Sequence, residues 1–138
     1  MSELTKILPP SAVVYDKTLF SMALPEVLSA LHAQHITSVA LVGIESHVCI
    51  LQSSLDLLRA GFDVYALHDG ISSCNPEEVP IAIARMRQEG VRVSTSESWL
   101  YEVMGDSSRK EFRDVLKVIK ETKEPTKEAL KKLCRSSL

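Results

Sequence analysis

The chain has 138 residues, of which 45% are hydrophobic and 25% are charged. This composition excludes disordered and collagen-like proteins and allows one globular domain with a buried core. No apolar run approaches the ~20 residues of a membrane span, and the N-terminal residues lack the apolar segment of a secretion signal. We therefore expect no membrane partner and a cytoplasmic location, with a mitochondrial or nuclear location as the alternatives.

The positions of the cysteines and glycines exclude several kinds of binding site. The three cysteines, Cys49, Cys74 and Cys134, stand far apart, and their odd number argues against a disulfide scaffold and for a reducing compartment. Neither CxxC nor HxxxH spacing occurs, and the five glycines stand alone, so the sequence has no zinc motif and no phosphate-binding loop. We accordingly expect no metal and no cofactor.

Charge is distributed unevenly along the chain. Residues 1–106 carry 6 basic and 13 acidic groups, whereas residues 107–138 carry 10 basic and 5 acidic groups. A basic tail can bind nucleic acid or anionic lipid. The alternative is a solvated helical face. Acidic residues are interleaved with the basic ones and no aromatic residue lies in the last turns, so we expect no nucleic-acid partner.

The first half of the chain predicts two strands and two helices. The β-branched run at 12–15 is typical of a strand, and Pro25 is typical of the first position of a helix. The apolar run at 38–43 has the pattern of a strand buried on both faces. A helix at 46–60 follows, ended by Gly61. Its predicted apolar face is Val48, Leu51, Leu55 and Leu58.

The second half continues the alternation of strands and helices. The remaining predicted elements are a strand at 62–67, a loop at 68–76, a helix at 77–89, a strand at 91–95, and helices at 96–104, 107–123 and 127–135, the last two separated by Pro125. This order predicts an α/β fold in which right-handed crossovers place helices on both faces of a parallel sheet. We expect one domain at 1–124 and a basic, frayed helical tail at 125–138.

Candidate site residues follow the strands, because ligands of parallel sheets bind at the carboxyl ends of the strands. Cys49 falls in the first turn of the helix after the strand at 38–43, where backbone N–H groups and the helix dipole favour a thiolate nucleophile. The alternative for Cys49 is a small buried hydrophobic residue. Lys17 follows the strand at 12–15 and could stabilise a thiolate or an oxyanion, or be an ordinary surface lysine.

Three further polar residues are weaker candidates for the site. His47 is two residues from Cys49, so the two side chains do not face each other on a helix. His68 could approach from the next strand end or be a solvated loop histidine. Asp69 is interpreted as a turn residue rather than an acid catalyst.

Four segments together resemble the isochorismatase-like cysteine hydrolases, and most of all the eukaryotic isochorismatase domain-containing proteins of the second type. The segments are VVYDKTLFSM at 13–22, VGIESHVCILQSSLDLL at 42–58, VYALHDGISS at 64–73 and VSTSESWLYEVMGD at 93–106. The resemblance extends to about residue 122. GIESHVC between a buried strand and a helix is a specific motif, and Lys17 with Ser21 upstream adds to it.

The resemblance implies a fold, a chemistry and an assembly. The fold is a three-layer, Rossmann-like α/β fold with a mainly parallel sheet. In the hydrolytic members a triad of Asp, Lys and Cys acts on a carbonyl or nitrile carbon, so Cys49 would attack and Lys17 would hold the thiolate and the substrate. A cis peptide at Ile44–Glu45 would leave the N–H groups of Glu45 and Cys49 as an oxyanion hole. Members are commonly homo-oligomers that act on small molecules.

This sequence departs from the family pattern at its beginning. Only 16 residues precede Lys17, and they contain no apolar-Asp-x-Gln segment, so neither the family Asp nor the central strand that carries it is present. Asp16 does not replace that Asp, because neighbours on a strand point to opposite faces. We therefore expect an N-terminally truncated isoform of a hydrolase of small amides or related molecules, inactive or impaired as this chain. The alternative is a non-catalytic protein that retains the fold for homo-oligomerisation or another interaction.

Overall fold

A computed structural model describes residues 6–134. Three parallel strands form one sheet in the order β1-β2-β3. The strands are β1 at Ser38–Gly43, β2 at Asp63–Ile71 and β3 at Arg92–Ser94. The predicted alternation of strands and helices and the parallel sheet are thereby confirmed.

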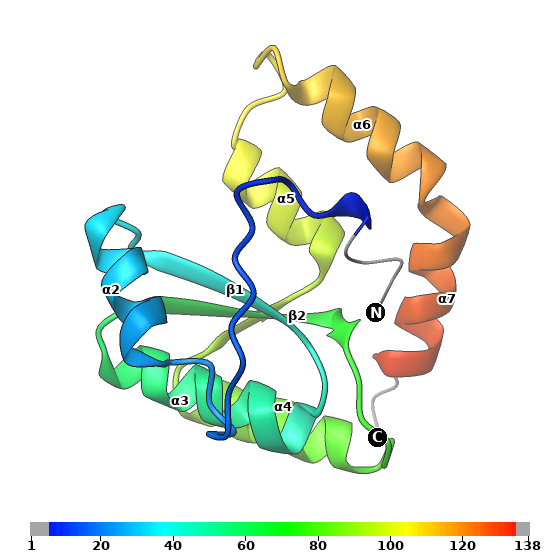
Figure 1. Ribbon diagram of the computed structural model, residues 1–138. Coiled ribbons are helices and arrows are strands. Elements are labelled where there is room, and N and C mark those ends of the chain that lie inside the picture. Colours follow the sequence, from blue (N-terminus) through cyan, green and yellow to red (C-terminus); the bar gives the residue numbers. More distant parts are fainter. Residues whose placement is uncertain (1–5, 135–138) are drawn as a thin grey trace.

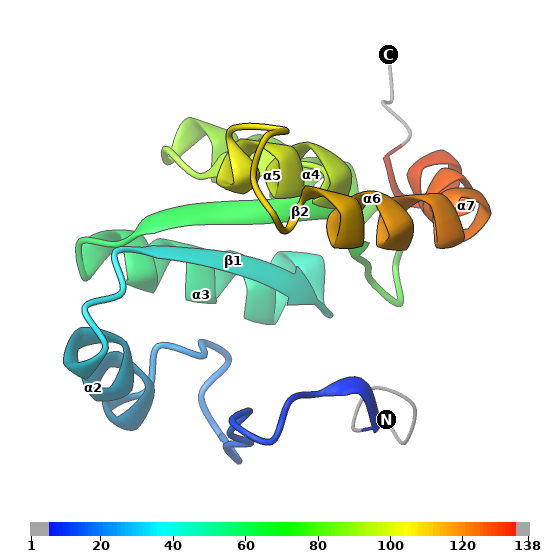
Figure 2. The same cartoon turned by 90° about the horizontal axis from the view of Figure 1, so that it is seen from above.

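Helices cover both faces of the sheet, as Figures 1 and 2 show. On one face lie the π-helical turn η1 at Ser46–Ile50, its continuation α3 at Leu51–Arg59, and α4 at Glu78–Gln88. On the other face lie α5 at Ser96–Met104 and α7 at Lys123–Leu133, joined by α6 at Phe112–Glu121. Helix α2 at Pro25–Ala33 precedes β1 and lies beside it.

The main core lies between the sheet and helices α3 and α4. It joins Val64, Ala66 and Ile71 of β2 to Ile83 and Met86 of α4, all of which are buried. Burial of such apolar side chains is the main contribution to the stability of the domain.

The buried face of the helix after β1 is rotated from the predicted one. Its most buried residues are Ile50, Leu51, Ser53, Ser54 and Leu57. A π-helical turn contains more residues than an α-helical turn, so η1 shifts the helical periodicity at the point where the motif begins. Ser53 and Ser54 are small side chains on the buried face, so they allow α3 to pack closely against the neighbouring elements.

Several predicted boundaries are wrong, each for a local reason. Residues 12–15 form no strand, because no neighbouring strand supplies hydrogen bonds to them. Strand β2 continues through the predicted loop to Ile71, with a register shift opposite Leu41 and Gly43. The break between the last two helices falls at Thr122, and Pro125 lies in the first turn of α7, where its missing N–H costs nothing.

The predicted tail is helical over most of its length. Helix α7 lies against β2 (Figure 1), so this part of the chain contributes to the packed layer. Arg135, at the end of the predicted helix, lies outside the described residues. Within residues 6–134, no helix is long and apolar enough to cross a bilayer.

Candidate active site

Lys17 and Cys49 lie side by side, although 32 positions separate them in the sequence. The ammonium Nζ of Lys17 is 3.6 Å from the Sγ of Cys49. Cys49 is half-buried in η1, directly after β1, and Lys17 comes from the extended N-terminal segment. The fold thus brings a cation and a thiol together directly after β1.

The segment that carries Lys17 is fastened to the helix below it. The backbone N–H of Met22 donates a 2.8 Å hydrogen bond to the Oγ of Ser53, which is 1% exposed. Ser53 is four residues after Cys49, so both side chains occupy the same side of the helix. Ser21, 6% exposed, accepts a hydrogen bond from the Ala23 N–H and tightens the same turn. The hydrogen bond between Met22 and Ser53 thus fixes the position of the Lys17 segment relative to Cys49.

The turn between β1 and η1 has an unusual backbone. Gly43 has a φ of 126°, which only glycine adopts readily, and the Ile44–Glu45 peptide bond is cis. The N–H groups of Val48 and Ile50 both donate to the Glu45 carbonyl oxygen. Cys49 lies between these two donors, and within the described residues the Glu45 N–H makes no hydrogen bond.

The loop after β2 closes over this turn. The Ser46 N–H donates to the Ser72 carbonyl, and the Ser72 N–H donates to the Gly43 carbonyl. The Glu45 carboxylate accepts a 2.7 Å hydrogen bond from the Cys74 N–H. That bond, together with the Ser73 side chain, lowers the pKa of Glu45. Glu45 is therefore an ionised structural group.

His47 faces the same loop. Its Nδ1 is 3.3 Å from the Oγ of Ser73, and among residues 6–134 it makes no hydrogen bond to Cys49. Ser46 is fully buried, and its Oγ is an unpaired polar atom at the site within the described part of the chain. Ser46, Ser53 and Ser72 lie within the segments that carry the resemblance, but no pattern indicated their hydrogen-bonding roles, because hydrogen bonds to the backbone leave no periodicity.

Asp69 and His68 are not loop residues. Both belong to β2, and Asp69 is 8% exposed. Its carboxylate accepts hydrogen bonds of 2.8 Å from the Ser96 N–H and 2.6 Å from the Ser96 Oγ, so it ties β2 to the start of α5. The interpretation of Asp69 as a turn residue is therefore wrong, as is that of His68 as a solvated loop histidine, because His68 is half-buried.

The described residues offer little for a metal ion. Within 6–134, no group of three or more His, Cys, Asp or Glu side chains converges in a way that could hold one. The candidate site therefore consists of Lys17, Cys49 and the backbone turn between β1 and η1.

Comparison with known proteins identifies the family. A family model described as "Isochorismatase domain" matches residues 1–98. The isochorismatase family protein 1B of Dictyostelium discoideum is 40% identical over 113 residues, which are 80% of this chain and 55% of that protein. The isochorismatase domain-containing protein 2 of Xenopus laevis is 41% identical over 108 residues, 78% of this chain and 53% of that protein.

A solved structure agrees with the sequence comparisons. The MAR1 ribonuclease of Caenorhabditis elegans superposes with a TM-score of 0.82 at 35% identity, over 86% of this chain and 61% of that one. The chain thus spans little more than half the length of the curated relatives and about three fifths of the solved one. On the family match, the identities and the shared fold, the chain belongs to the isochorismatase-like hydrolase family.

Proposed function

We propose that this chain carries the nucleophilic half of a cysteine-dependent hydrolase of small amides or related molecules. The observation that carries the proposal is the 3.6 Å contact of Lys17 Nζ with Cys49 Sγ at the start of a helix. The fixed ammonium favours the thiolate, which is the nucleophilic form of cysteine.

The reaction follows from this placement. The Cys49 thiolate attacks the carbonyl carbon, a C–S bond forms, and the electron pair of the carbonyl π bond moves to the oxygen. The Glu45 and Cys49 N–H groups are proposed to stabilise that oxyanion. The oxyanion then re-forms the carbonyl as the C–N bond breaks, and the nitrogen takes a proton from water and leaves as an amine or ammonia. The remaining hydroxide adds to the thioester carbon, and the C–S bond breaks to release the acid and the Cys49 thiolate.

Proton transfer is the weak step of this mechanism. Among residues 6–134, neither Lys17 nor Cys49 contacts a carboxylate, and Glu45 is already engaged with Cys74. A positioned acid–base group contributes about 10²–10⁴-fold to a rate. We therefore propose that the 138-residue chain turns over amides slowly or not at all, while its thiol remains activated.

Thiol reactivity tests the proposal without requiring turnover. Iodoacetamide labelling near neutral pH, followed by peptide mass spectrometry, gives the rates of Cys49 and of Cys74, which is the more exposed thiol. We expect Cys49 to react faster and to lose that advantage in Lys17→Met. Labelling of Cys74 that equals or exceeds that of Cys49 in the wild type would refute the activated nucleophile.

Substrate class requires a second assay. Nicotinamide and simple aliphatic amides represent the small-amide class, and a single-stranded RNA oligonucleotide represents the substrate class for which the MAR1 ribonuclease is named. Any hydrolysis should disappear in Cys49→Ala and persist in Cys74→Ala. Hydrolysis of RNA alone would exclude the small-amide class, and hydrolysis that survives Cys49→Ala would exclude the nucleophile.

A non-catalytic, self-associating protein is the second candidate. The observation that favours it is the outer edge of β1, which pairs with no other strand of the described sheet. Val42 near its end and Ile44 directly after it are exposed. Unpaired, uncharged strand edges promote association with another chain. Its test is the oligomeric state of the purified chain in solution.

A further inference from the structure

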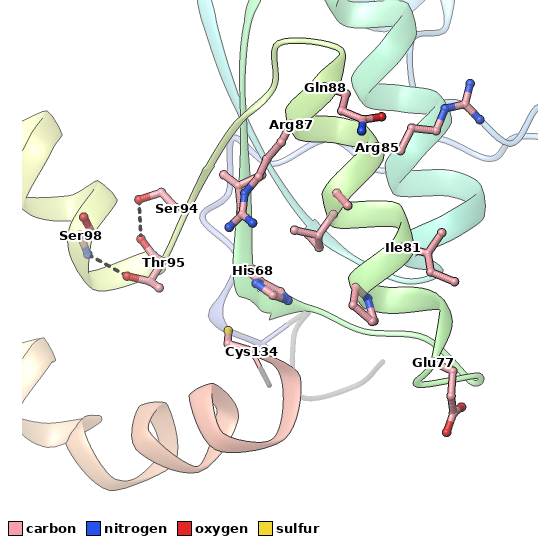
Figure 3. A pocket seen from close by; sticks show the side chains of 14 residues that line it. His68, Glu77, Ile81, Arg85, Arg87, Gln88, Ser94, Thr95, Ser98 and Cys134 are labelled. Carbon is pink, nitrogen blue, oxygen red and sulfur yellow. Dashed lines mark hydrogen bonds between the residues drawn. The ribbon is translucent and has the colours of Figure 1, made fainter. Parts of the chain in front are cut away.

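A second polar region lies away from Lys17 and Cys49. A cavity of about 1110 Å³ opens between α4, the end of β3, the start of α5 and the last turn of α7, and neither Lys17 nor Cys49 lines it. Figure 3 shows why it forms here: α4 lies on one side and α5 on the other, and the chain leaving β3 turns away from α4. Such a crevice at the carboxyl ends of parallel strands is where ligands of α/β proteins bind.

Two nitrogen-bearing side chains face each other at one end of the cavity: half-buried His68 and exposed Arg87. The Nε2 of His68 is buried and makes no hydrogen bond within the described part of the chain. Arg87 of α4 extends toward His68 (Figure 3), and no carboxylate pairs with it among residues 6–134. A buried polar atom without a partner is costly, and an unpaired arginine is a donor for carboxylate or phosphate oxygens.

The other walls supply hydroxyl groups and apolar surface. Ser94 and Thr95 at the end of β3 and Ser98 of α5 carry the hydroxyls, and Pro80 and Ala84 of α4 line the opposite side. Thr95 Oγ1 accepts a hydrogen bond from the Ser98 N–H, which leaves its hydroxyl hydrogen free to donate. The cavity therefore combines a cationic end with an apolar wall and hydroxyl donors.

We propose that this cavity binds a small organic anion, a carboxylate or phosphate group on an apolar body. The anionic group contacts Arg87 and His68, and the apolar body lies along α4. Arg85, two residues before Arg87, also lines the cavity, but its guanidinium group points away from His68 in Figure 3, and its Nε lies 3.9 Å from the Glu89 carboxylate, so we propose that it does not contact the anionic group. This site is independent of the proposed hydrolase chemistry at Cys49.

The charges around His68 make binding pH-dependent. Burial and the nearby charge of Arg87 lower the pKa of His68. A hydrogen bond with the Leu133 backbone and the negative charge of Asp69 act to raise it, but these are the smaller effects. Cys134, directly after α7, also faces the ring, and Glu77 lies at the far end of the cavity with its side chain turned outward (Figure 3). A bound anion offsets the effect of Arg87 and stabilises protonated His68, so binding takes up a proton and strengthens as pH falls.

Histidine NMR on the intact chain tests the proposal. The imidazole signals of the four histidines are followed during titration with phenyl phosphate, benzoate and, as the uncharged control, benzyl alcohol. The His68 signal is assigned by its loss in His68→Gln. We expect saturable shifts of His68 with at least one of the two anions, with phenyl phosphate and benzoate distinguishing a phosphate from a carboxylate ligand.

Two arginine variants on α4 test whether Arg87 itself contacts the anion. Arg87→Gln should weaken anion binding about tenfold or more, the value of one charge-assisted hydrogen bond. Arg85→Gln is the matched control and should bind as the wild type does, as should Cys49→Ala. Equal weakening by both arginine variants, an equal response to benzyl alcohol, or the absence of a saturable His68 shift with both anions would overturn the proposal.

Discussion

Ser53 supports the candidate site through one buried hydrogen bond. Its hydroxyl oxygen accepts from the Met22 N–H at 2.8 Å and is the link between the Lys17 segment and α3. Ser54, the next residue, is equally buried but donates to the Ile50 carbonyl within its own helix. The Ser54 hydroxyl also contacts the Met86 sulfur of α4 at 3.3 Å. The two neighbours thus separate a bond that positions the site from contacts that stabilise α3 and its packing on α4.

Replacing each serine by alanine separates these roles. Ser53→Ala and Ser54→Ala should each lower the free energy of unfolding by about 1–2 kcal/mol, because each removes a buried hydrogen bond. Only Ser53→Ala should also slow the alkylation of Cys49, since it releases the segment that holds Lys17. Urea melts and iodoacetamide labelling measure the two effects, and an unchanged Cys49 rate in Ser53→Ala would disprove the positioning role of the hydrogen bond between Met22 and Ser53.

His68 gives stability a defined pH dependence. The pKa of His68 is lowered in the folded chain, chiefly by burial and by Arg87. Between that lowered pKa and the ordinary value near 6.5, the unfolded chain binds more protons, so stability falls as pH falls through this window. Thermal melts from about pH 7.5 to 5.5, in buffers without phosphate or carboxylate, should show this loss.

His68→Gln provides the control for that measurement. Glutamine removes the titrating group and keeps a polar side chain, so its melting temperature should depend less on pH over the same range. Equal pH dependence in the wild type and in His68→Gln would assign the effect to other groups.

At the scale of whole elements, regular patterns were predictable from the sequence and interruptions were not. Strand β1 at Ser38–Gly43 and helix α5 at Ser96–Met104 were predicted with their observed bounds, because apolar runs and helix signals are local properties. The end of β2 was not, since the polar pair of His68 and Asp69 imitates a loop. Asp69 is tolerated in the strand only because Ser96 of a later helix satisfies its carboxylate.

The candidate site shows the same division. The strand–helix turn indicated Cys49, and the family resemblance paired it with Lys17, which the structure places 3.6 Å away. Neither local pattern nor resemblance indicated Ser53 or the cavity beside Arg87. Both depend on side chains from elements far apart in the chain, and those distances are set only when the sheet is complete.

Gly70 is an element-scale test of how β1 and β2 fit together. A Cβ atom at Gly70 would lie 2.8 Å from the Cγ1 of Val42, too close without a shift, and 3.3 Å from its Cβ, which is a tight contact. Gly70→Ala should therefore lower the free energy of unfolding by about 1–3 kcal/mol, the usual cost of overpacking.

Val42→Ala supplies the matching control for this contact. It removes the Cγ1 atom that a new Cβ would meet, so Val42→Ala combined with Gly70→Ala should lose less stability than the two single losses would add up to. Chemical denaturation of all four proteins measures the coupling. Simple additivity would show that the contact does not limit this pair of strands.

For the whole molecule, the outer edge of β1 is a surface that pairs with no other strand of the described sheet. The side chains of Val42 and Ile44 are 57% and 64% exposed, and Val13 and Val14 of the N-terminal segment are also exposed. The curated relatives are longer chains, and the described sheet of this one ends at β1. Association through this edge is the predicted way to cover it.

Light scattering of the purified chain tests that prediction. We expect homo-oligomers or aggregates, and we expect Val42→Lys to shift the population toward monomer, because a lysine on an edge strand opposes pairing. Val118→Lys on α6, a residue 52% exposed, is the control and should leave the oligomeric state unchanged. A monodisperse wild-type monomer would contradict the prediction.

The hydrogen bonds of Lys17 limit what its charge can do. Its ammonium group has three N–H bonds, and the Leu19 carbonyl, the Phe20 carbonyl and the Cys49 sulfur accept one each. The chain thus encloses its own cation much as a crown ether encloses an ammonium ion. A molecule arriving at Cys49 would meet a saturated cation that acts through its field, and it could gain a hydrogen bond from Lys17 only by displacing one of these three acceptors.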